Sequence, residues 1–145
     1  MRYGEATFTK HIRKIITYTG AANLGATGTA ATIFTVTGEV LVVALVPVCT
    51  TNLGESAASS TITLGVTGDV DLFILATAAL DIDADDFWFD ATPIEVGGIA
   101  IPAALKDIAI TANIISDHTG VGNTNAGVIR YELYWSPLSL DAQVS

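Results

Sequence analysis

The chain has 145 residues and a net charge of −9, with only six Lys or Arg residues, two His and one Cys. Charged residues make up 14% of it, against roughly 25% in an average soluble domain. This composition lacks the basic stripe of a nucleic-acid-binding protein and the spaced His, Cys, Lys or Gly-rich motifs of recognisable enzymes. We therefore expect no catalytic residue, no cofactor and no nucleic-acid partner.

The mean hydropathy of +0.53 raises the question of a membrane. The longest apolar run, residues 40–49, is interrupted by Pro47 and has about half of the roughly 20 residues that a spanning helix needs. The N-terminal residues also lack the apolar core of a secretory signal. We expect no membrane partner, and we expect Cys49, at the end of the apolar run, to be a buried small side chain.

The N-terminal fourteen residues differ from the rest because they hold four of the six basic residues. These four residues are Arg2, Lys10, Arg13 and Lys14. We predict that residues 1–14 form a basic arm ahead of a single acidic domain, residues 15–145, and that the four side chains contact a neighbouring copy or another acidic surface. The alternative is that residues 12–18 form an ordinary first strand whose basic side chains face solvent.

Alternating apolar residues predict half-buried antiparallel strands in several places. The inward side chains would be Ile62, Leu64 and Val66 in residues 61–67, Ile108, Ile110, Ala112 and Ile114 in residues 107–115, and Ile129, Tyr131, Leu133 and Trp135 in residues 128–135. Residues 40–46 are apolar without alternation, which is typical of a central strand covered on both faces. The tail after Pro137 is short, and we expect it to be loosely ordered.

One short motif, Val-Thr-Gly-acid-Val, occurs at residues 36–40 and again at residues 66–70. A Thr-Gly-acid turn fits a tight hairpin in which Gly supplies the positive φ. We therefore predict two hairpins, which join residues 30–36 to 40–46 and residues 60–66 to 70–77. Short strands between Gly-rich turns predict an all-β fold, a single antiparallel β-sandwich or jelly roll with an N-terminal arm.

The densest charge cluster has an acid at every second position, at Asp81, Asp83 and Asp85. This spacing is like that of the first ligands of a calcium loop. However, Asp86 stands where an EF-hand needs Gly, and Thr92 stands where it needs Glu. We therefore expect a solvated acidic loop, and we keep the first three Asp residues as a calcium candidate.

Two other function classes remain open from the residues alone. Trp88 is predicted to face outward beside the acids as an interface anchor, and an exposed Trp88 or Trp135 would serve a carbohydrate-binding β-sandwich as a stacking platform.

Ser116, Asp117 and His118 are adjacent in sequence and cannot form a catalytic triad, whose members meet through the fold. We expect a surface turn there, and a hydrolase would instead require a buried pair of acids.

Three segments are similar to a known class of proteins. They are TGAANLG at residues 19–25, FTVTGEV at residues 34–40, and DIDADDFWFDATP at residues 81–93. Through these three segments the chain resembles small structural proteins of tailed bacteriophages. The resemblance implies a non-enzymatic capsid decoration (cement) protein, made in the host cytoplasm, which binds the major capsid protein on the virion surface as a homotrimer. It leaves a neck or tail accessory as the alternative and assigns no contact residue.

Overall fold

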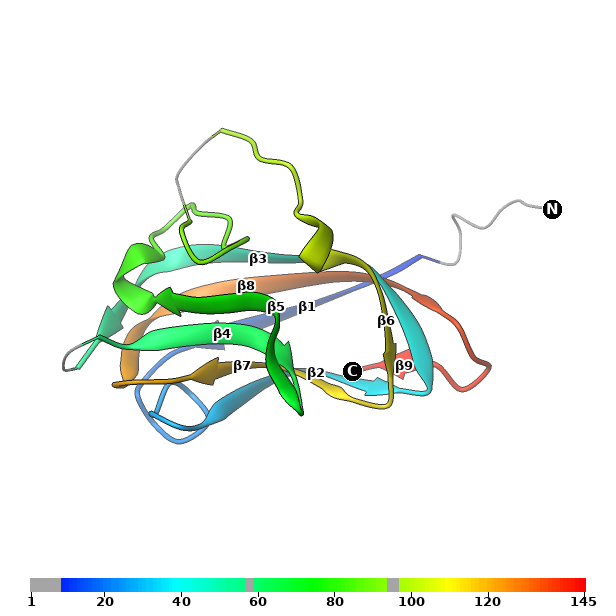
Figure 1. The fold of residues 1–145 in the computed structure, drawn as a ribbon, viewed down its shortest axis with the longest axis horizontal. Helices are drawn as coiled ribbons and strands as arrows, with labels where there is room; N and C mark the ends of the chain where they lie inside the picture. The colour runs from blue at the N-terminus through cyan, green and yellow to red at the C-terminus, as the bar shows by residue number, and fades with distance from the viewer. Residues whose placement is uncertain (1–8, 57–58, 94–96) are drawn as a thin grey trace.

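Two antiparallel sheets face each other across an apolar core in the computed structural model, which describes residues 9–56, 59–93 and 97–145 (Figure 1). The four-stranded sheet has the order β1 (Lys10–Thr17), β8 (Thr124–Pro137), β3 (Glu39–Glu55), β6 (Lys106–Thr111). The five-stranded sheet has the order β5 (Asp69–Ala78), β4 (Thr61–Val66), β7 (Ile114–Thr119), β2 (Ala30–Thr37), β9 (Gln143–Val144). The predicted all-β sandwich is confirmed. Among the described residues, no helix is long and apolar enough to cross a membrane.

Alternation along the strands builds the inner face of each sheet. In β8 the buried apolar side chains are those of Ile129, Tyr131, Leu133 and Trp135, and in β4 they are those of Ile62, Leu64 and Val66. Both sets agree with the predicted inward faces, because successive side chains of a strand point to opposite sides of the sheet. Removing their apolar surface from water drives the two sheets together.

β3 is a central strand of its sheet, with β8 on one side and β6 on the other. Val40, Val42 and Leu45 are fully buried, whereas the side chains on the outer face of β3 are only half-buried. The predicted central strand is therefore confirmed, although its outer face is only partly covered. Cys49 is buried as predicted, and burial, aided by the charges of Asp86 and Asp83, raises the pKa of its thiol to about 11.

Only one of the two predicted hairpins forms. β4 and β5 pair around the second Thr-Gly-Asp turn, but β2 and β3 lie in different sheets. The first turn therefore carries the chain from one sheet to the other. It is held at this corner by later parts of the chain, because Gly38 O accepts from Ala112 N and Glu39 O accepts from Leu138 N, both at 2.8 Å. A turn motif fixes a change of direction, but it does not choose the strand's partner.

The strand predicted over residues 107–115 is two strands. β6 ends at Thr111 and β7 begins at Ile114, with Ala112 in the left-handed region at a φ of +38° between them. The turn reverses the alternation, so Ile114 is 36% exposed and Ile115 is fully buried. The prediction that Ile114 faces the core is wrong for this reason.

The C-terminal tail is more ordered than predicted. β9 pairs with β2 opposite Val36 and Thr37. Beyond β9, the backbones of Thr35 and Ser145 exchange two hydrogen bonds, of 2.8 and 3.0 Å. The tail thus forms the last strand of the five-stranded sheet. Backbone pairing with β2 orders it, and the short length and few apolar residues of the tail do not reveal this pairing.

The two lateral sides of the sandwich differ. On one side the chain after β5 continues through a short 3₁₀ helix, η2 (Ala79–Asp81), and runs along the edge of β3, where Trp88 N donates to Pro47 O at 3.1 Å. A second 3₁₀ helix, η3 (Ala103–Leu105), leads back into β6. On the other side, β1 and β2 border a groove of about 370 Å³, which includes Arg13 and Lys14.

The two copies of the Thr-Gly-acid turn allow a matched test. Gly38 and Gly68 both have positive φ, and any other residue there costs about 1 kcal/mol. A Cβ at Gly38 would also lie 2.5 Å from Asp141 Oδ1 and 2.7 Å from Ser139 Oγ, whereas one at Gly68 meets nothing within 4 Å. We expect Gly38→Ala to lower the free energy of unfolding clearly more than Gly68→Ala, as measured by urea denaturation. Equal losses would contradict the corner described here.

Candidate functional site

A buried carboxyl group lies between the two sheets. Asp117 on β7 accepts hydrogen bonds from the hydroxyl groups of Tyr18 and Tyr131, and the Tyr131 bond is 2.8 Å long. The two hydroxyl oxygens lie 3.1 Å apart, and all three side chains are buried. Tyr18 directly follows β1 and Tyr131 lies on β8, so the core cluster of these three residues joins one sheet to the other.

Burial controls the protonation of the core cluster. It raises the pKa of Asp117 to about 6, although hydrogen bonds from Tyr18, Tyr131 and the backbone of Ala31 act in the opposite direction. Burial and the charge of Asp117 raise the pKa of both tyrosines well above the usual value, so that their hydroxyl groups stay protonated donors. Because Asp117 is 1% exposed, a substrate in solvent cannot reach its carboxylate.

The prediction of a surface turn at residues 116–118 is wrong. These residues belong to β7, where Asp117 points into the core and its neighbours Ser116 and His118 point to the opposite face. The three side chains therefore do not converge as a triad. The alternation of inward and outward side chains along β7 is the signal that could have located Asp117. Asp117 shares the inward face with Ile115 and Thr119, which are both buried.

A second acid is enclosed on the outer face of the four-stranded sheet. Glu132 on β8 is 7% exposed, because three basic nitrogens, His11 Nε2, Arg13 Nε and Arg130 Nε, each lie 2.7 Å from its carboxylate. Burial opposes its ionisation, but the hydrogen bonds from His11 and Arg13 and the charges of both arginines hold the pKa of Glu132 below its usual value. The ring of Tyr134 stacks on His11, with the ring centroids 4.8 Å apart.

The structure places the predicted interface residues in different environments. Lys10, Arg13 and Lys14 lie within β1 and are exposed, so the strand alternative describes them better than an arm ending at residue 14. Arg2 lies outside the described residues. Trp88 is not an exposed anchor, since it is fully buried and its Nε1 donates to Thr77 Oγ1 at 2.9 Å.

The prediction for Trp88 failed because the segment after β5 folds back over the side of the core. Three aromatics in succession allowed either the middle or the outer rings to face inward. The backbone of this segment pairs with β3, with an isolated bridge between Val48 and Phe87, and this places Trp88 in the core. Trp135 is also buried, so neither Trp offers the exposed ring that sugar stacking requires.

The acidic loop is built as a turn. Asp86 is buried and its Oδ2 accepts from Asp83 N at 2.9 Å, while Asp85 takes a left-handed φ of +76°. Asp81 and Asp83 are exposed. Within the part of the chain that the structure describes, no group of three or more His, Cys, Asp or Glu side chains could hold a metal ion. The calcium candidate therefore does not form a ligand set there.

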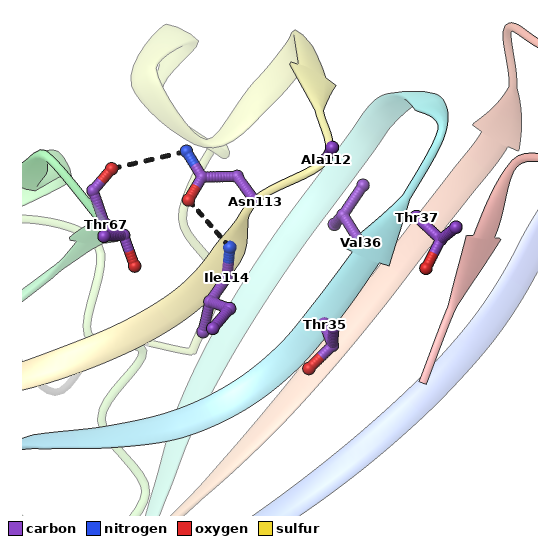
Figure 2. A pocket seen from close by; sticks show the side chains of 7 residues that line it. All are labelled: Thr35, Val36, Thr37, Thr67, Ala112, Asn113 and Ile114. Carbon is purple, nitrogen blue, oxygen red and sulfur yellow. Dashed lines mark hydrogen bonds between the residues drawn. The ribbon is translucent and has the colours of Figure 1, made fainter.

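A hollow of about 370 Å³ lies at one end of the sandwich, and Figure 2 shows the side chains that line it. It is lined by Thr35, Val36, Thr37, Thr67, Ala112, Asn113 and Ile114. The amide group of Asn113 is already engaged, since its Nδ2 donates to Thr67 O at 3.4 Å and its Oδ1 accepts from Ile114 N at 2.8 Å. None of the lining residues is an acid, a base or a thiol, so the lining holds no base that would activate its threonine hydroxyl groups as nucleophiles.

Comparisons with protein-family models, with curated proteins and with solved structures found no match to this chain.

The core cluster predicts an unusual dependence of stability on pH. The folded pKa of Asp117, about 6, lies above the ordinary value of 3.8. The stabilising effect of its proton is thus fully present below pH 3.8 and is lost as the pH rises through about 6, a change of about 3 kcal/mol. We expect Asp117→Asn to remove this component, as measured by urea denaturation from about pH 4 to about pH 8.

The exposed residue Asp81 provides the control, because Asp81→Asn changes the same charge outside the core. This variant should keep the pH dependence of the native chain. If Asp117→Asn and the native chain lose stability in parallel as the pH rises, Asp117 does not titrate as described.

Proposed function

We propose that this chain is a non-enzymatic structural protein of a tailed-bacteriophage virion, a capsid decoration protein that binds the assembled lattice of the major capsid protein. The observation that carries the proposal is the exposure of large apolar side chains on strands and loops around a well-filled core. At least half-exposed are Ile15, Leu75, Leu80, Val121, Leu138 and Leu140. These side chains would supply apolar area to a contact with another protein.

The use of the buried acids inside the fold supports the same proposal. Asp117 is enclosed by two tyrosines and Glu132 by three basic groups, so both serve packing and ion pairing. The outer strand surfaces are rich in Thr and Ala, which have little side-chain entropy to lose when a surface becomes an interface.

The resemblance of residues 19–25, 34–40 and 81–93 to small phage structural proteins supplies the partner and the location. From this resemblance we propose that the chain lies on the capsid surface, as a homotrimer at local threefold positions of the lattice. A neck or tail accessory remains the second candidate, because the same resemblance covers it. The carbohydrate-binding alternative is not proposed, since it depended on an exposed Trp88 or Trp135.

Binding to separated virion parts tests the proposal. Heads and tails are purified from phage particles that lack this chain because its gene has been deleted. Each part is mixed with the purified chain and pelleted. We expect saturable binding to heads, at a ratio fixed by the lattice, and none to tails. Binding to tails alone would favour the accessory role, and binding to neither part would overturn the proposal.

A further inference from the structure

Positive charge is concentrated on one edge of the molecule. The structure describes five Lys and Arg residues, and four of them lie on the adjacent strands β1 and β8. They are Lys10, Arg13, Lys14 and Arg130. β1 is the edge strand of its sheet, since it pairs with β8 alone among the described strands. We call β1, with the side chains of β8 that adjoin it, the basic edge.

Negative charge is concentrated at the opposite edge. The segment that follows β5 pairs with the side of β3 that faces away from β8 and β1, as the hydrogen bond of 3.0 Å from Cys49 N to Asp86 O shows. β5 is itself the edge strand of the five-stranded sheet. We call residues 69–90 the acidic edge. Its exposed acids are Asp69, Asp71, Asp81, Asp83, Asp85 and Asp90.

The charges on the two edges are only partly neutralised within the described chain. Glu132 pairs with Arg13 and Arg130, whereas Lys10 and Lys14 have no acidic partner among the described residues. Asp69 and Asp71 lie side by side, and their hydrogen bond and mutual repulsion raise the pKa of Asp69. A cation brought by another molecule would relieve this repulsion.

Both edges also expose apolar side chains next to the charges. Ile15 on β1 and Tyr134 on β8 are exposed at the basic edge. Val70, Leu75 and Leu80 are exposed at the acidic edge. Each edge therefore combines apolar area with an excess of charge of one sign, and opposite charges on two facing surfaces steer their association.

We propose that copies of this chain associate head to tail, with the basic edge of one copy against the acidic edge of the next. A symmetric contact that joins two basic or two acidic edges would place like charges opposite each other and is disfavoured. A head-to-tail contact is heterologous, so it forms a ring if its rotation closes and an open chain if it does not. A ring of three is the trimer included in the proposed function, and on that point this inference rests on it.

Two double variants each neutralise charges on one edge and leave the ion pairs of Glu132 unchanged. Lys10→Gln with Lys14→Gln neutralises the basic edge, and Asp69→Asn with Asp71→Asn neutralises the acidic edge. Lys106→Gln and Glu39→Gln each remove one exposed charge that belongs to neither edge, and they serve as matched controls. Thermal melting of every variant confirms that it is folded.

Sedimentation velocity at low and high salt then measures the association of the full chain. We expect the native chain and both controls to associate at low salt and to dissociate as salt screens the edges. Each double variant alone should associate at least about tenfold more weakly. An equal mixture of the two should form dimers and stop there, because each variant retains the edge that the other lacks.

Three results would overturn the inference: a native chain that stays monomeric at low salt, association that neither double variant weakens, and a mixture that forms no dimers. Sedimentation needs no virion, so its outcome is distinct from that of head binding. A chain that binds heads as a monomer would contradict head-to-tail association and leave the decoration role standing.

Discussion

The enclosure of Asp117 between the sheets is the constraint on which the rest of the structure depends. Its carboxylate holds the hydroxyl groups of Tyr18 and Tyr131 and thereby connects β7 with the β1 and β8 side of the sandwich. A buried acid must keep its hydrogen-bond partners, because an unpaired charge in the core costs several kcal/mol. The sheets are therefore fixed at this point, and the strand edges beyond it are presented in a defined arrangement.

The separation of charge follows from the same arrangement. β1 carries the basic residues next to the open groove, whereas the acidic segment after β5 covers the opposite side of the sandwich. Edge strands expose unpaired backbone groups and are protected in many proteins by charged side chains. In this chain the two edges carry opposite signs, so the same charges that prevent pairing of like edges favour pairing of unlike ones.

Local sequence patterns predicted the positions of the strands well, but they predicted poorly which strands pair with each other. The alternation of β4 and β8 and the apolar run of β3 gave the core, because burial acts residue by residue along a strand. Two turn motifs that differ only in Glu39 against Asp69 gave one hairpin and one crossover, since the partner of a strand depends on distant segments. Asp117 was missed because the polar residues 116–118 were predicted to form a surface turn. The two tyrosines that hold Asp117 in the core lie elsewhere in the sequence, on the β1 and β8 side of the sandwich.

Hydrogen–deuterium exchange of the chain, as the free monomer at high salt and bound to capsids, tests most directly whether the two strand edges form its interfaces. We expect slower exchange in β1 and in residues 69–90 on binding, with no change in the hollow around Asn113. Unchanged exchange at both edges, together with protection at that hollow, would contradict it.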